Sequence, residues 1–255
     1  MRRLIVGDLH GNLKGLLDAL QKANFHPDKD MLYAVGDYVD GHPDTYELIE
    51  YLNALPNFKG VIGNHDKWFL DFAWTLNNCG QALAENIWYK QGGRNTIASY
   101  PGLKIQRQTM SGSFYEGKIP DHHLKFMQDL ELYIELDDRR ILIVHAGYER
   151  TPLGYGTKRK GWGKIGDKEI DPEHLMWTRS FWEFAENHKN PDYDKVFIGH
   201  TQDNSYPKCK KGIIWNIDSG AGYDGYVTVM DIDTLQYWKS EAALEYYPDF
   251  LKTRG

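Results

Sequence analysis

Side chains that can bind metal ions follow short apolar runs at five places in this sequence. The runs have the length of buried strands, and in four of them a glycine separates the run from the polar residue. The side chains that follow are Asp8, His10, Asp37, Asn64, His145 and His200. Carboxylate, amide and imidazole ligands without cysteine suit hard to borderline divalent ions such as manganese, iron or zinc. The pattern therefore predicts a site for two divalent metal ions and does not itself choose among the three metals; we take manganese as the first candidate, with iron and zinc as the alternatives.

Asp37 is the expected bridge between the two ions. The ligands expected for the first ion are Asp8, His10 and Asp37, and those for the second are Asp37, Asn64, His145 and His200. A carboxylate that bridges two ions about 3.5–4 Å apart lowers the pKa of a shared water, and both ions neutralise charge on a phosphoryl group. The predicted chemistry is hydrolysis of phosphate esters.

His65 follows a predicted ligand directly, so its imidazole should enter the same pocket. There it can donate a proton to the leaving oxygen near pH 7. A nearby carboxylate would hold the ring protonated and oriented, and Asp40, three residues after Asp37, is the candidate. We therefore expect His65 and Asp40 to be catalytic residues.

The elements that carry these residues are predicted to be strands of one α/β domain. Asp8, Asp37 and Asn64 are separated by 29 and 27 residues, about the length of a strand-helix-strand unit. Parallel strands of this kind bring ligands together at their carboxyl ends. Helical spacing of apolar residues predicts covering helices over 13–20, 45–55 and 175–187.

The segment from about 67 to 136 differs from the rest because it is rich in Trp, Leu and Phe and has no strand that ends in a ligand. The helices predicted within it cover 67–76, 81–90, 95–100 and 121–130. We interpret residues 1–255 as a single domain with a mainly helical insertion at about 67–136.

Composition limits the function classes. The 255 residues are 41% hydrophobic and 14% aromatic, as in a globular domain, and the net charge of −6 argues against general nucleic-acid binding. Two distant cysteines, Cys79 and Cys209, fit a reducing compartment. No apolar run approaches the roughly 20 residues of a membrane span, and the first one is too short for a signal peptide. These features predict a cytoplasmic protein that does not bind membranes.

The motifs around the polar residues resemble those of the calcineurin-like metallophosphoesterases, in particular the bacterial and phage branch of the phosphoprotein phosphatases. Residues 7–11 (GDLHG) are similar to the family's GDxHG, 36–41 (GDYVDG) to its GDxVDRG and 63–66 (GNHD) to its GNH motif. Residues 144–147 (VHAG) and 198–201 (IGHT) match its two later histidine motifs. The resemblance covers most of the chain.

This resemblance implies an α/β fold, a four-layer α-β-β-α sandwich of two mixed sheets. It also implies two metal ions and single-step hydrolysis of phosphate monoesters, including Ser/Thr phosphoproteins, by a metal-bound water. The family's metal ligands and acid fall on the residues proposed above. Arg179 matches the family's second phosphate-binding arginine, and Asn64 is a further expected phosphate contact.

One position departs from the family pattern. Gly41 stands where GDxVDRG has an arginine that clamps phosphate oxygens. Arg94, beside Gly92-Gly93, or His42 is the candidate replacement. A surface role for these residues remains the alternative.

Three functions stay open at this point. The first is a metal-dependent phosphomonoesterase, and the second is a hydrolase of dinucleoside polyphosphates such as diadenosine tetraphosphate, the substrate of a related branch. The third is a non-catalytic phosphate-binding regulator, which only Gly41 favours. Residues 151–171, with five glycines and five basic residues, are either a surface loop or a basic lid over an anionic substrate.

Overall fold

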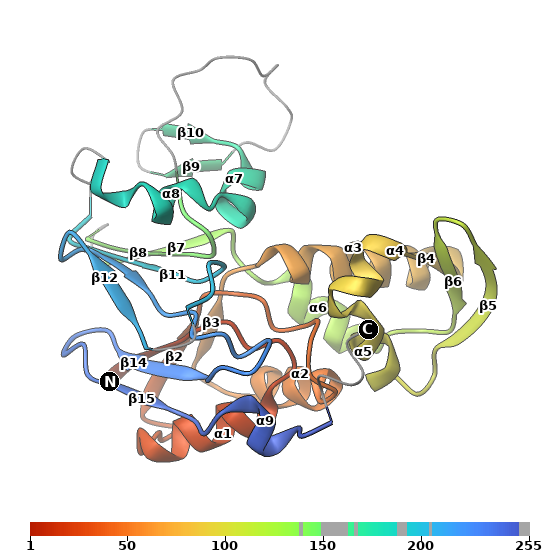
Figure 1. Cartoon of the computed structure of the whole chain (residues 1–255), viewed down its shortest axis with the longest axis horizontal. Helices are drawn as coiled ribbons and strands as arrows, with labels where there is room; N and C mark the ends of the chain where they lie inside the picture. Colours follow the sequence, from red (N-terminus) through yellow and green to blue (C-terminus); the bar gives the residue numbers. More distant parts are fainter. Residues whose placement is uncertain (138–139, 149–162, 166–167, 188–192, 204–205, 250–255) are drawn as a thin grey trace.

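The first of two main sheets carries three of the predicted strand ends. The computed structural model describes residues 1–137, 140–148, 163–165, 168–187, 193–203 and 206–249 (Figure 1). The strand order of this sheet is β15-β14-β1-β2-β3. Strands β1 (Arg2–Val6), β2 (Asp30–Ala34) and β3 (Phe58–Gly60) are parallel. Strand β14 (Thr228–Asp231) is antiparallel to β1, and β15 (Tyr237–Lys239) is antiparallel to β14.

The second sheet has the order β12-β13-β11-β8-β7. Its central strands β13 (Ile214–Asn216), β11 (Lys195–Ile198) and β8 (Ile141–Val144) are parallel, and its outer strands β12 (Lys208–Lys210) and β7 (Tyr133–Leu136) are antiparallel. Both sheets are therefore mixed, as the family resemblance implied.

Alternating side chains hold the two sheets face to face. Ile5, Ile143 and Phe197 belong to one buried cluster shared by both sheets. Their strand neighbours Leu4 and Leu142 pack instead into two separate clusters with the helices. Because successive residues of a strand point to opposite faces, each sheet is buried on both sides. The expected four-layer α-β-β-α sandwich is confirmed.

Two of the predicted covering helices are present nearly as expected, and the third is divided. Helices α1 (Leu13–Lys22) and α2 (Thr45–Ala54) cover the first sheet, and the Asn12 side chain caps α1 by accepting the Gly15 N–H at 2.8 Å. The single helix predicted over 175–187 is wrong. It is divided into α7 (Pro172–Trp177), α8 (Ser180–Glu183) and a 3₁₀ turn (Ala185–Asn187) on the second sheet. The break between α7 and α8 exposes Arg179.

The segment between β3 and β7 combines helices with a small sheet. Its elements are α3 (Asn64–Cys79), β4 (Gln81–Glu85), α4 (Asn86–Trp88), a π-helical turn (Tyr89–Gly93), α5 (Arg94–Ser99), β5 (Lys104–Thr109), β6 (Gly112–Glu116) and α6 (Asp121–Gln128). The helix predicted over 81–90 is wrong in its first half, which is β4. Ala82 and Ala84 are buried there while Gln81 and Glu85 are exposed, the two-residue period of a strand.

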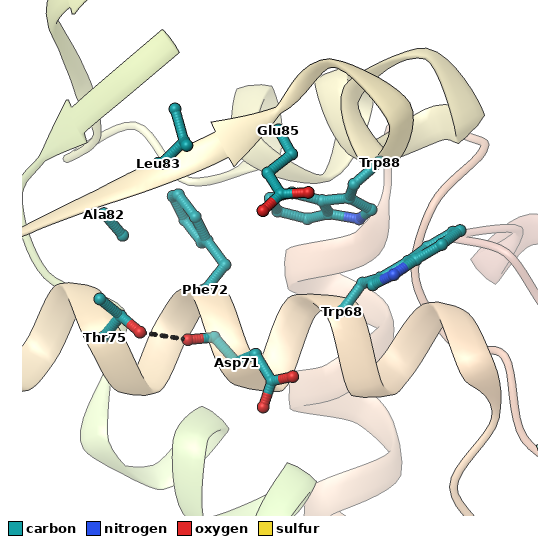
Figure 2. Close-up of a pocket in the computed structure, with 8 residues that line it drawn as sticks. All are labelled: Trp68, Asp71, Phe72, Thr75, Ala82, Leu83, Glu85 and Trp88. Atoms are coloured by element: carbon teal, nitrogen blue, oxygen red, sulfur yellow. Dashed lines mark hydrogen bonds between the residues drawn. The ribbon is translucent and has the colours of Figure 1, made fainter. Parts of the chain in front are cut away.

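A cavity of about 420 Å³ opens between α3 and the β4–α4 segment (Figure 2). Its lining residues are Trp68, Asp71, Phe72, Thr75, Ala82, Leu83, Glu85 and Trp88. Trp88 and Phe72 are almost fully buried and form its aromatic wall.

The proposed basic lid falls largely outside the described residues, which omit 149–162 and 166–167. Within the described part of that segment, β9 (Gly163–Ile165) and β10 (Lys168–Ile170) form an antiparallel pair. Among the described helices, none combines the length and apolar character that a membrane crossing requires.

Phe197→Ala should destabilise the protein strongly, because it opens a cavity between the two sheets. Phe197 is fully buried, and such truncations cost about 3–5 kcal/mol. Chemical denaturation should show this loss in the free energy of unfolding. Phe184→Ala is the matched control, since Phe184 is 56% exposed. Equal losses in the two variants would contradict the two-sheet core.

Candidate active site

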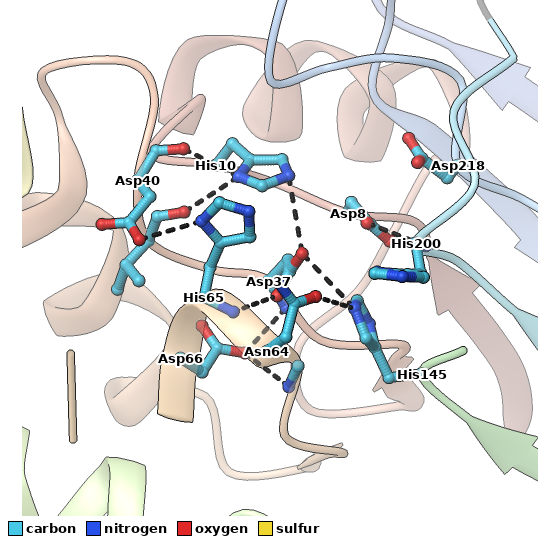
Figure 3. Close-up of polar contacts among 12 residues, drawn as sticks. Asp8, His10, Asp37, Asp40, Asn64, His65, Asp66, His145, His200 and Asp218 are labelled. Carbon is cyan, nitrogen blue, oxygen red and sulfur yellow. Dashed lines mark hydrogen bonds and ion pairs between the residues drawn. The ribbon is translucent and has the colours of Figure 1, made fainter. Parts of the chain in front are cut away.

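The carboxyl ends of five parallel strands meet at one point. Strands β1, β2 and β3 of the first sheet lead to Asp8, Asp37 and Asn64, while β8 and β11 of the second lead to His145 and His200. Figure 3 shows these side chains turned toward a common centre, with His10 and His65 beside them. All the ligands predicted for the two ions therefore converge.

The Asp37 carboxylate lies in the middle of this group. Its Oδ2 atom is 3.3 Å from Nε2 of His145 and 3.7 Å from Nε2 of His10. Ligand atoms of Asp37, His145 and His200 lie within 4.8 Å of one another, as do those of His10, Asp37 and His65. Two cation positions that share Asp37 fit this arrangement.

Hydrogen bonds orient the histidines as ligands. Nδ1–H of His10 donates to the carbonyl oxygens of Val39 (3.0 Å) and Asp40 (2.7 Å), and Nδ1–H of His145 donates to that of Val35 (2.7 Å). Each ring thus directs Nε2 toward the centre. Second-shell contacts of this kind fix the tautomer of metal-binding histidines.

Atoms without hydrogen-bond partners indicate that the site is built for cations. Asp8 Oδ1 and His200 Nε2 are both buried with no hydrogen-bond partner. His145 Nε2 faces two oxygens, Asn64 Oδ1 at 3.1 Å and Asp37 Oδ2 at 3.3 Å. Buried polar atoms are normally paired, so these atoms need a proton or a metal ion. The donor set fits the predicted pair of divalent ions.

Glycines allow the carboxylates to approach the backbone closely. A Cβ atom at Gly63 would lie 2.0 Å from Asp37 Oδ1, and one at Gly199 would lie 1.9 Å from Asp8 Oδ1. No larger residue fits at either position. This explains why glycine precedes a polar residue at these strand ends.

The combined effect of burial and neighbouring charges raises the pKa values of two groups at the centre, His145 and Asp8. Burial lowers the pKa of His145, but the Asp37 carboxylate outweighs it and raises that pKa to about 10. Burial also raises the pKa of Asp8 well above its ordinary value, with Asp218 adding to the effect. Without cations the centre therefore retains protons, and metal binding must displace them.

Four residues of the site have left-handed backbone conformations. The φ angles are 46° for His10, 53° for Asp37, 67° for Asp40 and 65° for His200. Non-glycine residues adopt this region at an energetic cost that tends to be concentrated at functional sites. The strand ends are thus bent to aim these side chains inward.

His65 and Asp40 form the pair that the sequence predicted. Nδ1–H of His65 donates to Asp40 Oδ2 at 2.9 Å. Burial lowers the pKa of His65, but Asp37 and the Asp40 hydrogen bond outweigh it and raise this pKa above its ordinary value. The arrangement suits a proton donor, with Asp40 as its positioning partner.

The segment between β3 and β7 holds Asp40 in place. Trp88 Nε1–H donates to Asp40 Oδ2 at 2.7 Å, and the Thr96 hydroxyl donates to Oδ1 at 2.8 Å while accepting the Asp40 backbone N–H at 2.8 Å. Gly92 packs so closely that a Cβ atom there would lie 2.7 Å from the Asp40 carbonyl carbon. Sequence analysis missed Trp88 and Thr96, since neither carries a pattern of its own.

The central pocket has a volume of about 90 Å³ and carries Arg179 at its edge. Nη1–H of Arg179 donates to the His200 carbonyl oxygen at 2.9 Å. Neither candidate replacement for the missing arginine lines this pocket. Arg94 is exposed at the start of α5, and His42 is buried, with Nε2 2.7 Å from the Ala221 carbonyl oxygen and its ring stacked on Tyr247.

Two further aspartates belong to the site. Asp218 lines the pocket, and burial raises its pKa to about 6, with Asp37 adding to the effect. It follows the apolar residue Ile217 just after β13, so the strand-end pattern could have identified it. Asp66 accepts the backbone N–H groups of Asp37 (2.7 Å), Tyr38 (2.7 Å) and Gly63 (2.9 Å), and thereby joins two ligand loops.

Parallel strands that deliver aspartates and histidines into one pocket, beside a histidine-aspartate pair, define a dinuclear metallohydrolase. A family model for calcineurin-like phosphoesterases matches residues 1–212. The chain belongs to this family and is a metal-dependent phosphoester hydrolase, which argues against the non-catalytic regulator.

Relatives that align with nearly the full chain include proteins from Bacillus. The asymmetrical bis(5'-nucleosyl)-tetraphosphatases PrpE of Bacillus cereus (strain AH820) and Bacillus anthracis (strain CDC 684 / NRRL 3495) are each 26% identical, over 98% of this chain and 98% of theirs.

Solved structures share the fold. The crystal structure of a candidate diadenosine tetraphosphatase matches with a TM-score of 0.63 and 20% identity, covering 93% of this chain and 92% of that one. A Saccharomyces cerevisiae serine/threonine phosphatase matches with a TM-score of 0.53 and 15% identity, covering 95% and 80%. At these identities the likeness concerns the fold alone.

Asp66→Asn should destabilise the protein and loosen the metal site. The amide has one acceptor oxygen in place of two, so backbone N–H groups of the ligand loops lose their partner. Hydrogen bonds to charged groups contribute about 1.5–3 kcal/mol, and denaturant unfolding should show a loss of this size. Asp121→Asn is the control, because Asp121 is exposed. A wild-type stability for Asp66→Asn would exclude the positioning role.

Asp37→Asn and His65→Asn should separate metal binding from proton donation. Asp37→Asn should lose bound metal, since the shared ligand is weakened, whereas His65→Asn should keep it. His65→Asn should slow phenyl phosphate, a poor leaving group, by about 100-fold or more, and p-nitrophenyl phosphate less. Elemental analysis and steady-state kinetics measure both effects. Loss of metal from His65→Asn would show that the acid role is wrong.

Proposed function

We propose that this chain hydrolyses dinucleoside polyphosphates, with diadenosine tetraphosphate as the model substrate. The support from relatives is the PrpE tetraphosphatases, which align with nearly the whole chain. The physical support is the charge of the central pocket. Among the described residues that line it, Arg179 is the only arginine or lysine, and Asp218 adds a carboxylate.

A single arginine suits the inner phosphates of a polyphosphate chain. A terminal phosphate monoester carries about two negative charges near pH 7, whereas an inner phosphate carries about one. Among its described lining residues, the pocket has no second guanidinium of the kind that a doubly charged group would favour. One arginine matches the single charge of an inner phosphate better than the double charge of a monoester. This match of charge is the main physical support for a phosphoanhydride substrate.

Each residue has a defined part in the proposed reaction. Arg179 and the Asn64 amide bind phosphate oxygens, and Asp40 orients His65. The oxygen of one water bonds to phosphorus, the bridging P–O bond breaks, and His65 protonates the leaving oxygen. The attacking water loses one proton to solvent, and His65 takes up one proton from solvent before the next turnover. Two nucleotides result.

Two manganese ions are the proposed cofactor. The expected ligands are Asp8, His10, Asp37, Asn64, His145 and His200, and Asp218 faces the same pocket. When bound, the ions supply charge neutralisation and activate water. Iron and zinc suit the same donors.

The proposed setting is a single catalytic domain in the cytoplasm. Residues 67–136 form the insertion, and its contacts with Asp40 make it part of the site. Cys79 and Cys209 are both free and exposed, as expected in a reducing compartment.

A phosphomonoesterase acting on Ser/Thr phosphoproteins is the second candidate. The intact pair of His65 and Asp40 favours it, because an alkoxide leaving group needs a proton more than a polyphosphate does.

Turnover of three substrates by the manganese-loaded protein tests these candidates. We expect kcat/KM to be at least about tenfold higher for diadenosine tetraphosphate than for a phosphoserine peptide or p-nitrophenyl phosphate, as differential binding of about 1.4 kcal/mol would give. Chromatography identifies the nucleotide products, and Asp37→Asn controls for contaminating phosphatases. A faster reaction with the phosphopeptide would reverse the assignment.

A further inference from the structure

The cavity between α3 and the β4–α4 segment adjoins the active site. Trp68 lines the cavity, and its ring lies edge-on to that of His65 with centroids 5.2 Å apart. Trp88 lines it as well and donates its N–H to Asp40. Two walls of the cavity therefore contact the two members of the proton-donating pair. The cavity therefore lies on the His65–Asp40 side of the site.

The chemistry of the lining selects the type of occupant. Trp68, Phe72 and Trp88 provide aromatic faces, on which nucleic-acid bases stack. Asp71 and Glu85 are both exposed at the cavity (Figure 2), and Asp71 forms an ion pair with Lys67. Among the described residues none of those lining the cavity is cationic, so phosphate is disfavoured there. The Glu85 carboxylate can instead accept the exocyclic N–H groups of adenine.

The size of the cavity agrees with this chemistry. Its volume of about 420 Å³ lies within the range of small-molecule pockets, roughly 300–1,000 Å³. The central pocket, by contrast, measures about 90 Å³ and is polar. One region thus suits a phosphate group and the other a nucleoside.

We propose that this cavity binds the purine nucleoside of the leaving nucleotide, with the base against Trp68 and Trp88. The inference rests on the proposed function, because it assigns one end of a dinucleoside polyphosphate. The phosphate chain extends from the cavity past His65 to Arg179. Nucleoside binding beside His65 places the leaving oxygen within reach of its proton.

Two substitutions that fill the cavity test the proposal. Thr75→Phe enters it from α3 and Leu83→Trp from β4, and both residues are partly exposed. Each should reduce the ratio of kcat/KM for diadenosine tetraphosphate to that for p-nitrophenyl phosphate by at least about tenfold. Asn78→Phe is the matched control, since Asn78 is exposed on the same helix outside the cavity, and should keep the wild-type ratio. Thermal unfolding verifies that the variants are folded. If either Thr75→Phe or Leu83→Trp does not fold, the other variant tests the proposal.

Calorimetric titration with adenosine provides a readout without turnover. The manganese-loaded wild-type protein and Asn78→Phe should bind adenosine, and the filled-cavity variants should bind it at least about tenfold more weakly. Unchanged ratios and unchanged adenosine binding in the folded variants would overturn the cavity assignment and leave the proposed function intact. If the wild-type protein does not cleave diadenosine tetraphosphate, the proposed function fails, while loss of adenosine binding in the variants would still support a nucleoside site.

Discussion

The buried carboxylate of Asp37 is the charge on which the arrangement of the two sheets depends. An ionised group away from water is costly unless opposite charges or hydrogen bonds compensate it. Burial raises the pKa of Asp37, but His145, His65 and His10 outweigh it and hold this pKa below its ordinary value. His145 comes from the second sheet, whereas Asp37 comes from the first. The site therefore forms only when both sheets pack with their carboxyl ends together.

Loops around this charge are held by residues that have no reactive role. Asp66 gathers three backbone N–H groups from the loops of Asp37 and Asn64. The Trp88 N–H and the Thr96 hydroxyl donate to the Asp40 carboxylate and hold that side chain in place. Such contacts offset the cost of the left-handed conformations at Asp37 and Asp40. Substitutions in the insertion can thus change the position of His65 without contacting substrate.

Sequence patterns predicted the strands and the convergence of the candidate ligands at their ends, because both depend on local features. The apolar runs before Asp8, Asp37 and His145 are strands, and their side-chain alternation explains the two sheet faces. The partners of Asp40 could not be predicted, since Trp88 and Thr96 lie 48 and 56 residues away in sequence. The break before Arg179 was also missed, because residues 175–187 keep a helical apolar spacing across it. The partners of Asp40 and the helix break before Arg179 both depend on contacts between residues that are distant in sequence.

The missing arginine and the orientation of His10 have a common structural basis. The loop from Asp40 to His42 wraps around His10: the Asp40 carbonyl accepts from its Nδ1–H, and the His42 N–H donates to its carbonyl at 2.7 Å. Between them Gly41 lies so close that a Cβ atom would be 2.7 Å from the His10 carbonyl oxygen and 2.9 Å from its Cβ. A side chain at position 41 would push this loop outward and release the contacts that fix the His10 tautomer. In this chain the loop that orients His10 therefore leaves no room for an arginine at position 41, and Arg179 is the only arginine among the described residues that line the central pocket.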